Sequence, residues 1–291
     1  MARRAANGRC ALIARCAVIG RRAAIAAMLA AALLVAGVAR AADVASIAAA
    51  SNLQFALPEI AAAFERSTGR HVRVSFGSSG NFRRQIADGA PFELFLSADT
   101  GYADALVRER RTIGAGVVYA VGRLALFVPD GSPVRADPAL RDVAAALADH
   151  RLRKFAIANP ELAPYGRAAQ QALEHAGLWA AIQPHLVLGE NISQAAQFAA
   201  SGAAQAGIVA YSLVKSPGME ARGHWALLAD AGHAPLAQKM VLLQGAGTTA
   251  RAFAAFMQSP QASAILTRYG FESPAGSVAA SAPRAVSPPP G

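Results

Sequence analysis

Cysteine is nearly absent from this chain of 291 residues. Both cysteines, Cys10 and Cys16, precede residue 42 and lie in a segment that we expect to be removed. The remaining chain therefore has no disulfide, no thiolate metal ligand and no cysteine nucleophile. Sequence motifs of catalysis are missing too: there is no HExxH, no GxSxG and no P-loop, and the histidines are scattered. We therefore expect neither an enzyme nor a cofactor.

A basic surface for nucleic acid is also missing, although the formal net charge is +10. Seven of the 28 basic side chains are arginines that precede Ala42, where there is no acid, which leaves 21 basic against 18 acidic side chains. The remaining excess of +3 forms no basic stripe with interleaved aromatic residues. We expect no nucleic-acid partner.

The two ends of the chain differ from its middle. Residues 1–41 have the pattern of a signal peptide, with a basic start, an apolar run at 23–38 and small residues at Ala39-Arg40-Ala41. The apolar run is short for a membrane span. We predict export to the periplasm, by either the general or the twin-arginine route, with cleavage after Ala41. Residues 273–291 are rich in Ala, Ser and Pro, which predicts a disordered tail.

Between these ends, short apolar runs alternate with helical patterns. The runs predict strands at 44–50, 71–76, 92–96, 117–128, 155–158, 185–188, 207–210 and 239–243. This alternation is typical of α/β folds with mostly parallel sheets covered by helices on both faces. We interpret 117–128 and 239–243 as crossings between two lobes. The first lobe would comprise 42–122 plus 238–272, and the second 123–237, with a ligand cleft between them.

Four predicted strand-to-helix turns have a common character, and they carry Ser51-Asn52, Ser78-Ser79, Pro164-Tyr165 and Ile192-Ser193. In parallel α/β sheets a ligand binds beyond the carboxyl ends of the strands, where helices begin. The first N–H groups of a helix have no internal partner and attract anions. One serine of Ser78-Ser79 can also serve simply as a helix cap. Two turns come from each lobe, as binding between lobes requires.

The turns offer hydroxyl groups, one side-chain amide and backbone N–H groups, but no carboxylate. A fully ionised oxyanion has only acceptor oxygens, whereas hydrogen phosphate also has a proton that needs an acceptor. Glu161 and Glu190 are the nearby side chains that could accept it. The turns therefore favour molybdate, tungstate or sulfate over phosphate.

At these turns the chain resembles the molybdate-binding receptors of bacterial ABC importers, which have the type II periplasmic binding-protein fold. The resemblance covers about residues 44–271. It is carried, in order, by Ala48-Ala-Ala-Ser-Asn52, Ser75-Phe-Gly-Ser-Ser79, Arg84-Gln-Ile-Ala-Asp-Gly-Ala-Pro91, Leu94-Phe-Leu-Ser-Ala-Asp99, Asn159-Pro160 through Pro164-Tyr-Gly166, Gly207-Ile-Val209 and Arg268-Tyr-Gly-Phe271.

The resemblance implies a monomeric solute receptor that binds molybdate or tungstate and delivers it to a membrane permease. It also implies five anion contacts, namely Ser51, Asn52, Ser79, Tyr165 and the backbone N–H of Ile192. Secondary candidates are Ser78, Ser193 and Tyr211. Some relatives have a tyrosine directly after the Gly-Ile-Val strand, where this chain has Ala210. Any metal would be bound only as the molybdate or tungstate oxyanion.

Three alternatives remain open at this point. The nearest is a receptor of the same fold for sulfate or another tetrahedral oxyanion. From other classes come an enzyme on this fold, such as a porphobilinogen deaminase, and a transcriptional effector domain. The deaminase attaches its cofactor through a cysteine, which residues 42–291 lack, and no helix-turn-helix segment precedes the lobes.

Overall fold

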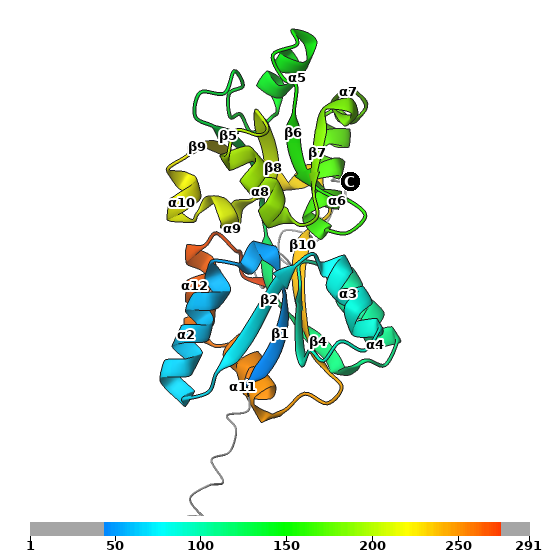
Figure 1. Cartoon of the computed structure of the whole chain (residues 1–291), viewed down its shortest axis with the longest axis vertical. Coiled ribbons are helices and arrows are strands. Elements are labelled where there is room, and N and C mark those ends of the chain that lie inside the picture. The colour runs from blue at the N-terminus through cyan, green and yellow to red at the C-terminus, as the bar shows by residue number, and fades with distance from the viewer. Residues whose placement is uncertain (1–43, 275–291) are drawn as a thin grey trace, which may run out of the picture. The chain divides into compact units, whose positions relative to one another are not determined.

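The computed structural model describes residues 44–274. The predicted signal peptide, and residues 275–291 of the predicted tail, lie outside the described residues. Two five-stranded sheets belong to one compact unit of the chain, Asp43–Gly291. The strand order is β2-β1-β3-β10-β4 in the first sheet and β7-β6-β8-β5-β9 in the second (Figure 1).

Each sheet has one reversed strand. In the first sheet β10 is antiparallel to both neighbours, and in the second β5 is antiparallel to both neighbours, so the other four strands of each sheet share one direction. The strands of the first sheet are β1 (Ala45–Ala50), β2 (Val72–Gly77), β3 (Leu94–Ser97), β4 (Thr112–Gly122) and β10 (Leu236–Leu243). Those of the second are β5 (Leu124–Pro129), β6 (Phe155–Ala158), β7 (Leu186–Gly189), β8 (Ala206–Ala210) and β9 (Gly223–Leu227).

We call the first sheet and the helices that its strands adjoin in the chain the first lobe, and the corresponding set around the second sheet the second lobe. The helices of the first lobe are α2 (Ala56–Thr68), α3 (Ser79–Ala87), α4 (Thr100–Arg108), α11 (Thr248–Phe256) and α12 (Pro260–Arg268), with the 3₁₀ turn η1 (Ser51–Leu53). Those of the second lobe are α5 (Arg141–Ala148), α6 (Pro164–His175), α7 (Trp179–Ile182), α8 (Ile192–Ala200), α9 (Tyr211–Val214) and α10 (Pro217–Glu220), with η2 (Gln183–His185) and η3 (Asp230–Gly232).

The chain passes between the sheets at two places. The run at 117–128 is divided at Gly122-Arg123, where β4 of the first sheet ends and β5 of the second begins. The chain returns with β10, which starts at Leu236. Both crossings were predicted from the apolar runs. The lobe limits at 122/123 and 237/238 stay a prediction.

Apolar side chains explain why helices cover both faces of the first sheet. One core joins α2, α11 and α12 through Phe64, Phe253 and Ile265. A separate core on the other face joins α3 and α4 through Phe82 and Leu106 (Figure 1). The second lobe has its own core, and it includes β5 and β6. No helix in residues 44–274 is both long and apolar enough to span a membrane.

Candidate functional site

The first two turns lie at the ends of β1 and β2. Directly after β1, the chain enters η1 with Ser51 and Asn52, both buried. After β2, Ser78 caps α3, because its Oγ accepts a hydrogen bond from the backbone N–H of Asn81 at 3.2 Å. Ser79 is then the first residue of α3, and its own N–H has no partner inside the helix. Ser78 therefore secures the helix and leaves Ser79 free for another role.

The other two turns lie at the ends of β6 and β7. Pro164 occupies the first position of α6, which suits its fixed backbone angle, and Tyr165 follows it. Asn191 caps α8 by accepting hydrogen bonds from the N–H groups of Ser193 and Gln194. Ile192 is thus the first residue of α8, and its N–H lacks an intrahelical acceptor.

All four turns meet around one small cavity. Its lining residues are Ala50, Ser51, Asn52, Gly77, Ser78, Ser79, Ala98, Ala163, Pro164, Tyr165 and Ile192. The five contacts implied by the resemblance are at most 3% exposed. The volume is about 10 Å³, near the least that one water molecule needs. No charged side chain of the described residues lines the cavity, so its occupant must be compact and held by neutral groups.

The hydroxyl groups at this cavity share one arrangement. The Oγ of Ser79 accepts a hydrogen bond from the N–H of Ala98 at 3.0 Å, and the Oγ of Ser51 accepts one from the N–H of Ser193 at 3.3 Å. In each case a protein N–H occupies an acceptor position of the oxygen. Each hydroxyl therefore retains its own hydrogen, which it can donate to a ligand.

Tyr165 repeats this arrangement. Its hydroxyl oxygen accepts hydrogen bonds from Nε2 of Gln238 at 3.1 Å and from Nδ2 of Asn52 at 3.4 Å. Burial raises the pKa of Tyr165 far above its ordinary value, and the hydrogen bonds from Gln238 and Asn52 offset this only in part. The hydroxyl is therefore protonated at neutral pH and can act as a donor.

The side chain of Asn52 is placed differently from our expectation that its amide would be one of the donors. Its Nδ2 group donates to Oε1 of Gln238 at 3.0 Å as well as to Tyr165. Its Oδ1 atom is buried and has no partner. In this arrangement the side chain of Asn52 supports Tyr165.

Two of the secondary candidates do not line the cavity. The hydroxyl of Ser193 donates to the carbonyl of Ser51 at 2.9 Å, so Ser193 joins the lobes beside the site. Tyr211 packs against Trp225, with ring centroids 5.1 Å apart. Its ring also borders Gly270. Ser78, the third, does line the cavity although its Oγ is the helix cap.

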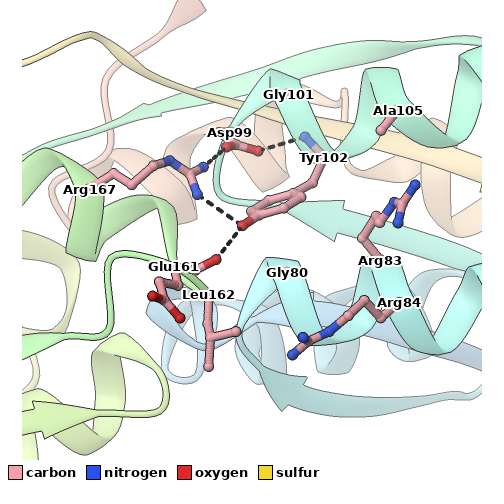
Figure 2. Close-up of a pocket in the computed structure, with 10 residues that line it drawn as sticks. All are labelled: Gly80, Arg83, Arg84, Asp99, Gly101, Tyr102, Ala105, Glu161, Leu162 and Arg167. Atoms are coloured by element: carbon pink, nitrogen blue, oxygen red, sulfur yellow. Dashed lines mark hydrogen bonds and ion pairs between the residues drawn. The ribbon is translucent and has the colours of Figure 1, made fainter.

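A larger cavity of about 550 Å³ lies next to the small one, and Figure 2 shows the side chains that line it. Arg167 of α6 forms an ion pair with Asp99 and donates a hydrogen bond to the hydroxyl of Tyr102 at 2.9 Å. The same hydroxyl donates to the carbonyl of Glu161 at 3.1 Å. Asp99 also caps α4, because its carboxylate accepts from the N–H of Tyr102. The partnership with Arg167 was missed.

Comparison with known proteins places this arrangement in a family. Residues 45–272 match the family model of bacterial extracellular solute-binding proteins. The chain belongs to this family. A molybdate-binding protein of Rhodobacter capsulatus is 40% identical over 227 residues, which cover 77% of this chain and 86% of the relative. One of Escherichia coli K12 is 30% identical over 228 residues, which cover 78% and 88%.

Solved structures agree with this solute-binding family. The periplasmic molybdate-binding protein of Azotobacter vinelandii superposes with a TM-score of 0.72 at 31% identity, covering 79% of this chain and 99% of that structure. A sulfate-binding protein of Mycobacterium tuberculosis gives a TM-score of 0.65 at 16% identity, covering 81% and 88%. The second likeness shows the fold alone. The predicted fold of two sheets flanked by helices is thus confirmed.

Proposed function

We propose that this chain is an exported receptor that binds molybdate or tungstate and delivers it to the permease of an ABC importer. The single observation that carries the proposal is the cavity where four strand-to-helix turns meet. Its three hydroxyl groups each accept a protein hydrogen bond and retain a hydrogen for the ligand. The similarity to molybdate-binding proteins over most of the chain supports the same ligand.

The anion contacts in this proposal are Ser51, Asn52, Ser79, Tyr165 and Ile192. Ser51 and Ser79 donate through their hydroxyls, Tyr165 through its phenol, and Asn52 and Ile192 through backbone N–H groups. Each hydrogen bond to a charged oxygen contributes about 1.5–3 kcal/mol, and partly buried helix N-termini add up to about 2 kcal/mol each. Neutral groups can therefore hold a dianion without any arginine or lysine in contact with it.

The size of the ion gives the order of affinities. Molybdate and tungstate have longer metal–oxygen bonds than the sulfur–oxygen bonds of sulfate, so their oxygens reach donors that sulfate leaves partly unpaired. Unpaired buried donors are costly. Hydrogen phosphate brings a proton, and no carboxylate among the described residues lines the cavity to accept it. We expect tight binding of molybdate and tungstate, weaker binding of sulfate and very weak binding of phosphate.

Export, lobe limits and assembly are parts of the same proposal. Cleavage after Ala41 would release the receptor into the periplasm, which suits a relative described as periplasmic. The first lobe would comprise 42–122 plus 238–272, and the second 123–237. The receptor would act as a monomer, without catalysis or a cofactor, and the permease would be its protein partner.

Titration calorimetry on protein stripped of anions tests the proposal. Molybdate, tungstate, sulfate and phosphate are compared at one pH and ionic strength. The proposal predicts the order given above. Sulfate binding as tight as that of molybdate would favour the sulfate receptor instead, and no binding of any of the four ions would refute an oxyanion receptor.

A further inference from the structure

Gln238 does not line the small cavity, but it contacts Tyr165, which does. It is a fully buried polar residue on β10, with 0% of its surface exposed. Its Oε1 atom accepts from the hydroxyl of Tyr119 and from Nδ2 of Asn52, each at 3.0 Å. Its Nε2 atom donates to the hydroxyl oxygen of Tyr165 at 3.1 Å. One amide thus connects the strand that returns to the first lobe with the tyrosine at the cavity.

The direction of these hydrogen bonds determines what Tyr165 can do. A phenol oxygen has one hydrogen and accepts at most about two hydrogen bonds. Gln238 and Asn52 supply two donors to this oxygen. The hydroxyl hydrogen of Tyr165 therefore cannot be donated to either amide nitrogen. It remains available for a hydrogen bond to the ligand.

We propose that Gln238 is a positioning residue that makes Tyr165 a hydrogen-bond donor to the bound oxyanion. This inference rests on the proposed function and deepens it. Two donors on Oε1, from Tyr119 and Asn52, fix the amide so that its nitrogen faces Tyr165. Were the amide turned over, its oxygen would take the hydrogen of Tyr165 and the ligand would lose a donor.

The surrounding backbone keeps this pair in place. Gly122 ends β4 at the first crossing, and a Cβ atom there would overlap the hydroxyl of Tyr165 and lie 2.7 Å from Nε2 of Gln238. The hydrogen bond between Gln238 and Tyr165 thus lies against both strands at which the chain passes between the sheets, β4 and β10. This packing leaves little space for the phenol or the amide to turn.

The arrangement also selects between kinds of oxyanion. A donor at Tyr165 suits an oxygen that has only lone pairs. It suits an oxygen that carries a proton less well, because such an oxygen is a weaker acceptor and its hydrogen finds no acceptor at the Tyr165 hydroxyl. Gln238 would therefore favour fully ionised oxyanions over hydrogen phosphate through Tyr165, without contacting the ion.

A double-mutant cycle tests this role. Molybdate affinity is measured by calorimetry for the wild type, Gln238→Met, Tyr165→Phe and the double variant. Each single change should weaken binding about ten- to a hundredfold, as expected for loss of one charge-assisted bond. The double variant should be weaker than Tyr165→Phe by no more than about twofold, because Gln238 acts through the hydroxyl that is already missing.

Tyr211→Phe is the matched control. It removes a tyrosine hydroxyl that does not line the cavity, so binding should change by less than about threefold. Gln238→Met should also lower the ratio of molybdate to phosphate affinity, which a general loss of stability would not do. If Gln238→Met does not fold, Gln238→Glu replaces it. The carboxylate of Gln238→Glu would repel the oxyanion with or without the Tyr165 hydroxyl, so this repulsion cancels in the cycle.

Three results would overturn the inference. The first is that the losses of molybdate affinity in the two single variants multiply in the double variant. The other two are an unchanged affinity in Gln238→Met and an unchanged affinity in Tyr165→Phe. Each of them leaves the receptor function standing as long as the wild type binds molybdate. A wild type that binds none of the four oxyanions would instead refute the proposed function.

Discussion

Ser78 and Ser79 are neighbours of the same type that have different environments. Ser78 caps α3, whereas the Oγ of Ser79 accepts from the N–H of Ala98 and lies at the shared cavity. The sequence Ser78-Ser79 predicted that one serine would be the cap, but could not say which. The distinction depends on the backbone of Ser78 being extended, which only the folded turn defines.

The two serines should therefore respond differently to substitution. Ser79→Ala removes a bond to a charged oxygen and should weaken molybdate binding by about 1.5–3 kcal/mol, about ten- to a hundredfold. Ser78→Ala should lower the free energy of unfolding by about 1 kcal/mol while changing affinity little. Calorimetry and urea unfolding separate the two effects. Equal losses of affinity in both variants would contradict this assignment.

Two buried tyrosines should make the protein sensitive to alkali. Burial raises the pKa of Tyr119 and of Tyr165 above the ordinary 10.0, and the nearby Tyr165 raises that of Tyr119 further. Below pH 10.0 both hydroxyls are protonated in the folded and the unfolded chain. Above it the unfolded chain releases protons first, so stability is lost as the pH rises towards the folded-state pKa values.

Urea unfolding across this pH range measures the effect. The free energy of unfolding should fall with a smaller slope in Tyr119→Phe than in the wild type, even though that variant is less stable at neutral pH. A wild type without any alkaline loss would show that these phenols titrate normally.

At the scale of elements, most of the alternation of strands and helices was predictable. Pro58 falls in the first turn of α2, where proline is tolerated. The carboxylate of Glu93 has a structural role, since it accepts from the N–H groups of Ser46 and Gly247. Strand β9 was not predicted, because Gly223–Leu227 contains Gly and His and is only partly buried at an edge. Phe55 is 37% exposed, although most large aromatic side chains are well buried.

The start of α3 is in close contact with the turn that precedes α6. The N–H of Gly80 donates to the carbonyl of Leu162 at 2.9 Å, and a Cβ atom on Gly80 would lie 2.6 Å from that oxygen and 2.8 Å from the hydroxyl of Tyr102. Gly80→Ala should thus hold the lobes apart and weaken molybdate binding at least about tenfold, although Gly80 does not line the small cavity.

Gly218→Ala is a suitable control for this change. Gly218 is also helical, and a Cβ atom there meets nothing within 4 Å. Small-angle scattering with saturating molybdate should show a larger radius of gyration for Gly80→Ala than for the control. Identical scattering and affinity in the two variants would mean that the contact with Leu162 tolerates the added methyl group.

At the scale of the whole molecule, contacts between the lobes extend well beyond the cavity. Nδ2 of Asn81 donates to Glu190 at 2.6 Å, Ser212 donates to the carbonyl of Asn52 at 2.8 Å, and Arg167 pairs with Asp99. The sequence could place helix starts at a common edge by the rule for parallel sheets. It could not pair Arg167 with Asp99, since the pairing depends on how two lobes far apart in the chain face each other.

Arg167→Ala should weaken molybdate binding modestly. The side chain of Arg167 is 40% exposed, and ion pairs at such positions are worth about 0.2–1 kcal/mol. We therefore expect a loss of at most about fivefold that shrinks at high salt. Arg83→Ala is the control, because Arg83 lines the same larger cavity but pairs with Glu109 of its own lobe. Equal losses in both variants would indicate a general effect of charge.

The burial of the cavity has a further consequence for rates. Because the five residues proposed to contact the ion are at most 3% exposed, a bound ion could leave only after the lobes separate. The dissociation rate would then equal the rate of productive opening, and each donor from Ser51 to Ile192 would lengthen the residence time rather than speed capture. A slow, gated release of this kind suits a carrier whose cargo must stay bound through diffusion, and it assigns to the permease the task of opening the lobes.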